Sequence, residues 1–491
     1  MAINLYSVRL VLKAFGTIDY GVYDVVTGVV LLLSSASSVM ATATQRFYAT
    51  ALGEGITGRF AAVFSATVAL YALLSIVIIV LGETLGLWFV NHVLVIPPHR
   101  LAAANTLYQF SLVTFVFGIL HVPFSSAIIS HEDLGLFAAV SVGESIAKLG
   151  VAELLTRLSN DAMTNYGAGL LVVAVLVATI FSLLAISRYD ECRYSAPLNR
   201  ALLGKILAFS GWLSFGSLAG VGLVQVLSIL VNLFFGPAVS AARAISLQLS
   251  NAISIFTGSL VTAARPAMIR AHSEGAFEYL NILFSASNKF IFYGLTLLCA
   301  PIIFEMDTVL GLWLGTPSNM AVLFSRLILV YAVIMALNNP ISVIVQATGH
   351  VKEYHLVVET FTLLCVPATY LLYRLGFPAL MAYIVMIIAA VAAHAARLWC
   401  IRRYYHGFDL SEYLRDFILP ALTVLAILAA VLYGVHRSVA NALLRLVVQV
   451  GTSSVLTLGL GYVIGITRAE RGLLKGVLRA RTGGGVSERS S

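Results

Sequence analysis

The sequence repeats itself at a shift of 220 residues, and this repeat constrains the fold more than any other feature. The matching pairs keep their order along the chain: Phe15-Gly16 with Phe235-Gly236, Thr42-Ala43 with Thr262-Ala263, and Glu54-Gly55 with Glu274-Gly275. A further match, Leu85 to Trp88 with Leu310 to Trp313, has a shift of 225 and implies one small insertion. A chain of two similar apolar halves is a common transporter layout, with the substrate site between the halves.

Long apolar runs follow one another along the whole chain. Hydrophobic residues make up 60% of the sequence and charged residues only 11%, whereas a soluble domain carries about 25% charged residues. The runs are about 20 residues or longer, which is the length that a helix needs to cross a bilayer. They lack the two-residue alternation of strands, and lipid tolerates only helices or closed barrels. The sequence therefore predicts an all-α polytopic membrane protein.

The runs predict about fourteen spans, of which the first is short. Fifteen residues at about 1.5 Å each cover about 22 Å of a hydrocarbon core about 30 Å thick. Either the true start lies upstream, or the first helix reaches only partway across. Pro123 and Pro340 predict kinks in the matching fourth and tenth spans. The predicted spans are 1–15, 20–43, 60–82, 102–129, 134–156, 164–187, 207–233, 239–263, 280–303, 322–346, 352–373, 378–400, 417–434 and 440–466.

Lysine and arginine predict the orientation of the chain. The connections from even to odd spans, together with the tail, hold 19 basic residues, and the connections from odd to even spans hold 4. Basic loops stay in the cytoplasm, so both termini are predicted to be cytoplasmic. The predicted domains are an N-terminal six-helix bundle (1–187), a cytoplasmic linker (188–206), a C-terminal six-helix bundle (207–405), two additional helices (406–466) and a basic, partly disordered tail (467–491).

Seven basic residues remain inside the predicted spans. Each costs about 2.5–3.5 kcal/mol at mid-helix, so such residues usually face the protein interior or a cavity. Arg326 and Arg445 lie near span ends and are expected to snorkel to the interface. The other five form the candidate substrate-binding set of a cationic cavity: Arg9, Lys13, Lys148, Arg243 and Lys289.

Four of these cations have alternative structural roles, and that of Lys148 is an ion pair. Arg9 and Lys13 are spaced i, i+4 and share one helix face, so they could instead pair with Asp19 or Asp24. Arg243, near the outer end of its span, could snorkel instead of lining a cavity.

Lys148 and Lys289 differ in their acidic neighbours. Lys148 lies one turn from Glu144, which suits a simple ion pair, whereas Lys289 has no acidic residue one turn away. A role in the substrate pathway is therefore favoured for Lys289. Glu144 and Glu359 fall in the corresponding fifth and eleventh spans, and with Asp24 they are the candidates for ion or proton coupling. A helix-to-helix hydrogen bond is an equal alternative for the two glutamates.

The repeat does not include the charges. A charge needed only for folding should occur more often in both copies, so the asymmetry favours a function between the halves. At the shift of 220, the residues that stand opposite four of the cations are uncharged: Ile229 for Arg9, Leu233 for Lys13, Tyr23 for Arg243 and Ala69 for Lys289.

The sequence carries no pattern typical of an enzyme. It lacks a phosphate-cradling GxxxxGK[ST] loop, zinc spacing and a serine-nucleophile elbow, so no catalysis, ATP hydrolysis, metal or cofactor is expected. The net charge of +8 does not indicate nucleic-acid binding, because the basic residues are spread over loops between spans. Four isolated cysteines fit small apolar packing residues: Cys192, Cys299, Cys365 and Cys400.

Several stretches resemble polysaccharide-biosynthesis flippases of the multidrug/oligosaccharidyl-lipid/polysaccharide exporter superfamily. The resemblance covers nearly the whole chain and points to the O-antigen-type branch. It is carried by RLVLKAFGTIDYGVYDVVTGVV with ATATQRFYATALGEG near the start, GLWF at 86–89, IPPHR at 96–100, FSGW at 209–212, NLFFGPAVSAARAIS at 232–246 and QATGHVKEY at 346–354.

The resemblance implies two six-helix bundles around a central cavity, plus two extra helices. It implies a flippase of the cell inner membrane that moves an undecaprenyl-diphosphate-linked oligosaccharide from the inner to the outer leaflet, for O-antigen or related lipopolysaccharide assembly. Partners would be the lipid bilayer and, in addition, a polysaccharide polymerase and glycosyltransferases. The alternative is a cation-coupled multidrug or small-molecule antiporter of the same fold. In-span basic residues outnumber acidic ones, which favours the anionic substrate.

Overall fold

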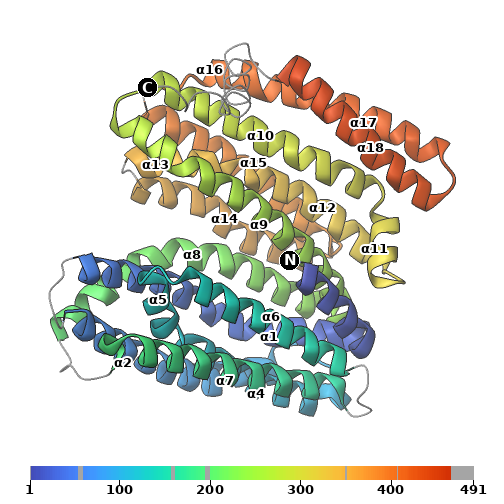
Figure 1. Cartoon of the computed structure of the whole chain (residues 1–491). Helices are drawn as coiled ribbons and strands as arrows, with labels where there is room; N and C mark the ends of the chain where they lie inside the picture. Colours follow the sequence, from blue (N-terminus) through green and yellow to red (C-terminus); the bar gives the residue numbers. More distant parts are fainter. Residues whose placement is uncertain are drawn as a thin grey trace, which may run out of the picture. The chain divides into compact units, whose positions relative to one another are not determined.

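The computed structural model describes residues 2–53, 59–155, 161–193, 200–348, 351–405 and 407–465. These residues form helices and short connections, with no strand among them (Figure 1). The first helices are α1 (Ala2–Gly53), α2 (Arg59–Leu81), α3 (Leu87–His92), α4 (Leu101–Leu120), α5 (Val122–Ser130), α6 (Leu134–Leu155), α7 (Ala162–Arg188) and α8 (Arg200–Phe235). The others are α9 (Pro237–Ser273), α10 (Phe277–Phe304), α11 (Met306–Leu314), α12 (Asn319–Ala336), α13 (Asn338–Thr348), α14 (Val351–Arg374), α15 (Met381–Tyr404), α16 (Leu410–Tyr413), α17 (Leu419–Ser438) and α18 (Ala442–Leu460).

The repeat is visible in the backbone at Gly16 and Gly236. Gly16 interrupts α1 with φ 73°, and Gly236 separates α8 from α9 with φ 77°. A side chain is strained in this left-handed region, so glycine is the residue that fits both turns. The break at Gly16 falls between the first two predicted spans. The predicted kinks are also present. A new helix, α5, begins at Val122, one residue before Pro123, and α13 begins at Asn338, two residues before Pro340.

Eleven of the described helices or helix pairs are long and apolar enough to cross a membrane. The first of them, Leu5–Leu32, covers parts of both of the first two predicted spans. The seventh and eighth predicted spans correspond to α8 and α9, which have 36 and 37 residues. At about 1.5 Å per residue both exceed the thickness of the hydrocarbon core. The protein is an all-α polytopic membrane protein, as predicted.

Contacts divide the chain into two compact units. Unit 1 is Met1–Ala244 with Val366–Met381, and unit 2 is Ile245–Cys365 with Ala382–Ser491. Helix α8, which the repeat places in the second half, packs along α1 in unit 1. A Cβ on Gly28 of α1 would lie 2.9 Å from Gln225 Oε1 of α8, so the two helices approach closely. The predicted ranges of the two bundles stay a prediction.

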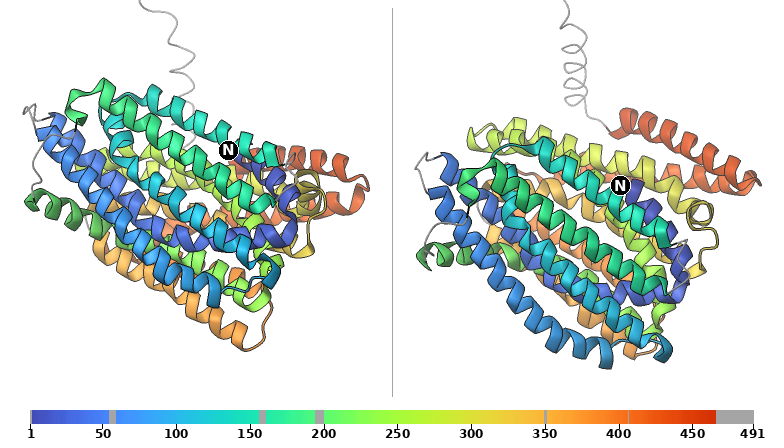
Figure 2. Two further views of the ribbon diagram at one scale, coloured as in Figure 1. Left: turned by 90° about the horizontal axis from the view of Figure 1, so that it is seen from below. Right: turned by 60° about the horizontal axis from the view of Figure 1, so that its bottom comes forward.

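Polar contacts confirm that the connections of unit 1 alternate between two ends. At one end, Arg100 Nε donates to Asp19 Oδ1 at 2.8 Å and Arg100 Nη2 donates to Asp161 Oδ1 at 2.8 Å. These residues come from the first, third and fifth connections between predicted spans. At the other end, Arg188 pairs with Asp133 at 3.0 Å, which joins the fourth and sixth connections. In both further views the helices of unit 1 run alongside one another (Figure 2).

Unit 2 shows the same alternation. Glu305 follows α10, and its Oε1 accepts from Arg445 Nε at 2.7 Å and from His436 Nδ1 at 2.7 Å. This joins the connection after α10 to the hairpin of α17 and α18. At the other end, Asn281 Nδ2 of α10 donates to the carbonyl oxygen of Gly407 at 2.7 Å, and the Tyr405 hydroxyl donates to Asn281 Oδ1 at 3.0 Å. Apolar side chains of α10, α13 and α15 fill the core between these ends.

Candidate functional site

Arg9 and Lys13 lie on the first segment of α1, and both side chains are exposed. Asp19, one of their predicted partners, instead accepts from Arg100. Lys13 makes no hydrogen bond or ion pair with the residues that the structure describes. An exposed lysine without such a partner keeps its charge available to a ligand.

Arg243 is completely buried in unit 1, so it does not snorkel. Its Nε donates to Ser228 Oγ at 3.0 Å and its Nη2 to the Val224 carbonyl oxygen at 3.1 Å, both on α8. Asp24 of α1 is partly buried and lies within electrostatic reach of Arg243. One guanidinium thus links three helices, α1, α8 and α9. This environment favours a positioning role over direct contact with a substrate.

Lys148 and Glu144 form the ion pair that their spacing predicts. Lys148 Nζ lies 2.6 Å from Glu144 Oε1, and 48% of the lysine side chain is exposed on α6. His121, at the junction of α4 and α5, lies within electrostatic reach of both and stacks on Phe181. The pair neutralises itself, so neither charge is isolated within unit 1. A role of Glu144 in coupling stays a prediction.

Lys289 is almost completely buried on α10, with 3% of its surface exposed. Asp416, on the π-helical turn Leu414–Ile418 before α17, lies within its electrostatic reach. The sequence gives no sign of this acidic neighbour, because 127 positions separate it from the lysine. Asp416 also accepts from Arg415 Nε at 2.8 Å. The charge of Lys289 therefore lies in an interior that also holds a carboxylate.

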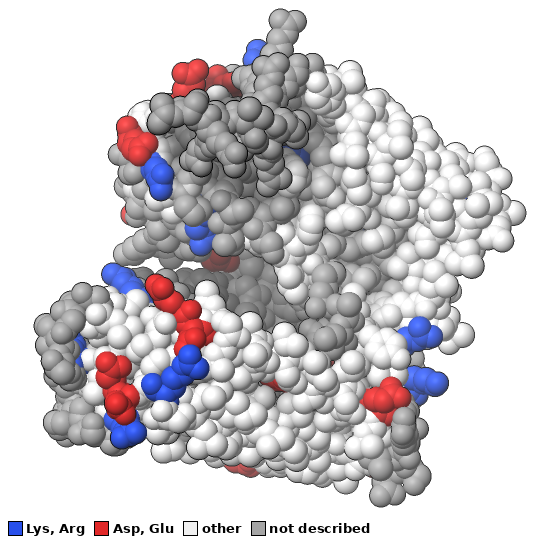
Figure 3. Space-filling model, in the orientation of Figure 1, with Lys and Arg blue, Asp and Glu red and all other residues white. Residues whose placement is uncertain are grey.

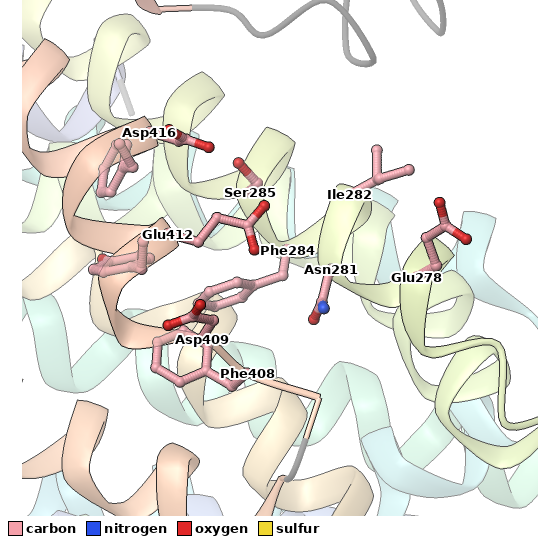
Figure 4. Close-up of a pocket in the computed structure, with 11 residues that line it drawn as sticks. Glu278, Asn281, Ile282, Phe284, Ser285, Phe408, Asp409, Glu412 and Asp416 are labelled. Carbon is pink, nitrogen blue, oxygen red and sulfur yellow. The ribbon is translucent and has the colours of Figure 1, made fainter.

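An acidic pocket of about 380 Å³ opens beside Asp416 in unit 2. Figure 4 shows side chains of α10 on one side and those of the 408–417 segment on the other. Hydrogen bonds from the side chain and backbone of Ser411 hold the pKa of Asp409 below its ordinary value, so this carboxylate is ionised. Four carboxylates and four aromatic rings line the pocket: Glu278, Asp409, Glu412, Asp416, Phe284, Phe408, Tyr413 and Phe417.

Glu359 is partly buried on α14. Its Oε1 lies 3.5 Å from His355 Nδ1, one turn earlier. It thus contacts a residue of its own helix, and its role in ion or proton coupling stays a prediction.

Arg326 and Arg445, the two arginines predicted to snorkel from span ends, have carboxylate partners. Arg326 Nη2 lies 2.6 Å from Asp307 Oδ2, and Arg445 pairs with Glu305. Glu305 is 1% exposed and also accepts from Gln449 Nε2 at 2.9 Å. Glu305 would be costly as an isolated buried carboxylate, so Arg445 stabilises it, whereas Asp307 is exposed. No signal in the sequence joins residues 140 positions apart.

Arg397 is a buried cation that the sequence places wrongly. It was expected with the loop arginines at the end of the span 378–400, but α15 continues to Tyr404 and only 6% of Arg397 is exposed. Its Nε donates to the Tyr354 hydroxyl at 3.0 Å. Elsewhere on the visible face, charged side chains gather toward the helix ends and uncharged surface covers much of the rest (Figure 3).

No family model matches the chain, and no curated protein matches it. Several solved structures match over most of its length. The lipid II flippase MurJ in an inward closed conformation gives a TM-score of 0.71 at 12% identity, over 94% of this chain and 96% of that one. An inward-facing multidrug resistance MATE family transporter of the MOP superfamily gives 0.69 at 15% identity, over 82% of this chain and 94% of that one.

A MOP superfamily transporter from Pyrococcus furiosus, described as having a binding pocket of reverse polarity, gives a TM-score of 0.53 at 16% identity. It covers 83% of this chain, and this chain covers 92% of it. These neighbours are transporters and a flippase that share one helical architecture. The chain therefore has the fold of the MOP superfamily transporters.

Proposed function

We propose that the protein is a flippase that moves a lipid-diphosphate-linked oligosaccharide from the inner to the outer leaflet of the cell inner membrane. The observation that carries the proposal is the extent of the structural matches. The MATE transporter accounts for 82% of this chain, whereas the lipid II flippase accounts for 94%. A flippase of lipid-linked substrates thus offers a structural counterpart to more of this chain than the multidrug transporter does.

The charges of the described residues support an anionic substrate. Lys289 is a buried cation of unit 2, and Lys13 is an exposed cation on a membrane-spanning helix. A diphosphate is the natural partner of such cations. We propose that Arg9, Lys13, Lys148 and Lys289 contact it in a cationic central cavity, while Arg243 holds α1 against α8 and α9. Alternating access of the two halves would carry it across, with both termini in the cytoplasm.

Transport of a defined substrate tests this function. Purified protein would be reconstituted into proteoliposomes with a fluorescent polyprenyl-diphosphate-linked oligosaccharide, and its arrival in the outer leaflet would be measured. We expect transfer above that of protein-free vesicles, and slower transfer in Lys13→Gln and Lys289→Gln than in the exposed control Arg403→Gln. Transfer equal to protein-free vesicles would rule the flippase out.

A second function has one observation in its favour. The acidic, aromatic pocket of unit 2 has the chemistry that binds organic cations. If the protein is a cation-coupled multidrug antiporter, an aromatic monocation should be exported against a proton or sodium gradient. Glu412→Gln should then reduce that export, with transfer of the lipid-linked sugar absent. The same vesicles distinguish the two functions, because the two substrates carry opposite charges.

A further inference from the structure

Arg397 is a buried cation that no carboxylate balances among the described residues. It lies on α15 of unit 2 with 6% of its surface exposed. The described ion pairs of unit 2 involve other residues. Its Nη1 atom is buried and has no hydrogen-bond partner in the part of the chain that the structure describes. Leaving a charged donor unmatched in an apolar interior is costly, so this edge of the guanidinium is suited to an anion.

Glu359, an acidic residue of the helix that carries Tyr354, does not fill this position. Glu359 lies on α14 within electrostatic reach of the Tyr354 hydroxyl. Its carboxylate contacts His355 at 3.5 Å, one turn earlier on the same helix. The described ion pair of Glu359 is with His355, and the described hydrogen bond of Arg397 is with Tyr354. An acceptor for Arg397 must therefore come from outside these residues.

His394, one turn before Arg397, is also engaged elsewhere. Its Nδ1 lies 2.8 Å from Asn338 Oδ1, so this nitrogen donates to the amide oxygen. Its Nε2 lies 3.4 Å from the Tyr413 hydroxyl, which donates to it. Both ring nitrogens of His394 are used, and the ring offers no acceptor to the guanidinium.

Tyr354 adds a second donor at the same place. Its hydroxyl oxygen accepts from Arg397 Nε at 3.0 Å, which leaves the hydroxyl hydrogen to donate to another group. The guanidinium supplies a positive charge and the phenol a neighbouring donor, and arginine is the side chain best suited to phosphate oxygens. We propose that Arg397 and Tyr354 bind a phosphate group inside unit 2.

The source of that phosphate group follows from the proposed function, on which this assignment rests. A lipid-linked substrate carries a diphosphate, and Arg397 lies near the C-terminal end of α15, at the end of the unit that the charge distribution places in the cytoplasm. Arg397 would then take up the diphosphate close to the inner leaflet, before it reaches Lys289 further along the pathway. A free inorganic anion is the other source of the same chemistry.

Binding to the purified full chain tests the site and separates the two sources. The probes are a polyprenyl diphosphate in nanodiscs and inorganic pyrophosphate, titrated against wild-type protein, Arg397→Gln, Arg397→Lys and Tyr354→Phe. The matched control is Arg403→Gln on the same helix, because Arg403 is exposed and lies over the Trp399 ring at 5.4 Å. Thermal unfolding of every variant shows whether it is folded.

We expect Arg397→Gln to weaken polyprenyl diphosphate binding about tenfold or more, since hydrogen bonds to a charged group are lost. Tyr354→Phe should weaken it several-fold, Arg397→Lys should recover part of the loss, and Arg403→Gln should bind as wild type does. Unchanged affinity in folded Arg397→Gln and Tyr354→Phe would overturn the site and leave the flippase proposal intact.

The wild-type titrations distinguish the remaining outcomes. Wild-type protein that binds only pyrophosphate, with that binding lost in Arg397→Gln, would keep the anion site and overturn the lipid-linked substrate. Wild-type protein that binds neither probe would overturn both proposals. If Arg403→Gln weakens binding as much as Arg397→Gln does, the loss reflects the overall charge of the protein, and the proposed site is overturned.

Discussion

Arg243 of unit 1 and Arg397 of unit 2 are both buried guanidinium groups, but their surroundings differ. Arg243 donates to Ser228 and to the Val224 carbonyl oxygen, and Asp24 lies within its electrostatic reach. Arg397 donates to the Tyr354 hydroxyl, and none of the described ion pairs of unit 2 includes it. The comparison teaches that burial by itself does not mark a functional charge. Arg243, with Asp24 nearby, holds helices together, whereas the charge of Arg397 is left available to a ligand.

Replacing Arg243 should have the largest effect on folding. In Arg243→Gln, the partly buried Asp24 loses its nearby cation, and Ser228 and the Val224 carbonyl lose a charged donor. Removing one partner from a buried charge pair typically costs about 3 kcal/mol. We expect a lower melting temperature and reduced yield in detergent. An unchanged melting temperature would show that Arg243 does not hold unit 1 together, and would return it to the set of candidate substrate contacts.

Helices α1 and α9 approach each other closely at Gly21, and this contact offers a second test of the packing around Arg243. A Cβ on Gly21 would lie 1.8 Å from the Pro237 carbonyl oxygen, which is backbone and cannot rotate away. Gly21→Ala should therefore cost about 2 kcal/mol through overpacking. Gly118→Ala in α4 is the matched control, because a Cβ there meets nothing within 4 Å. Equal melting temperatures for the two variants would contradict this packing.

Replacing Arg397 should not destabilise the protein. Arg397→Gln removes a buried charge that no described carboxylate balances, and such replacements are often neutral or stabilising by about 1 kcal/mol or more. We expect a melting temperature equal to or above that of wild type when no ligand is bound. A clear decrease, comparable to that of Arg243→Gln, would show that the two arginines have the same structural role.

The smallest effect concerns the ionic contacts of Arg100 at one end of unit 1. Burial opposes ionisation of Asp161, but hydrogen bonds from Thr164 and Arg100 outweigh it and lower its pKa below the ordinary value of 3.8. A lowered pKa contributes stability above the ordinary value, and this stability is lost as the pH falls through the folded-state pKa. Below about pH 4, the free energy of unfolding of the wild type should therefore fall more steeply with decreasing pH than that of Asp161→Asn. If the free energies of unfolding of the two proteins depend on pH in the same way, the contacts of Asp161 with Thr164 and Arg100 do not lower its pKa.

Much of the architecture follows from the sequence, because helices in lipid satisfy their own backbone and their length is set by the bilayer. The shift of 220 relates Gly16 to Gly236, and both adopt the same left-handed backbone. The i, i+4 spacing of Glu144 and Lys148 was enough to predict their ion pair. These features are local, or are repeated locally, and local patterns are what a sequence displays.

The polar contacts between distant helices could not be predicted. Asn232 accepts from the Val95 backbone N–H at 2.9 Å across 137 positions, and Glu305 accepts from Arg445 across 140. Such contacts depend on which helix faces meet, and hydrophobic helices carry little periodicity to show it. Arg397 is one of the 19 basic residues counted with the loops and the tail, although α15 continues to Tyr404 and keeps Arg397 buried.

The most direct test of the proposed role of the buried cations compares transport by two double variants that remove the same number of positive charges. Proteoliposomes with Lys289→Gln/Arg397→Gln would be compared with those containing Arg402→Gln/Arg403→Gln, whose arginines are exposed on α15. Transfer of a polyprenyl-diphosphate-linked oligosaccharide and the melting temperature are measured for both. We predict wild-type transfer in the control and at least about tenfold slower transfer in the buried pair, with melting curves that show both double variants to be folded. Equal transfer in the two double variants would contradict the claim that the buried cations of unit 2 receive the diphosphate.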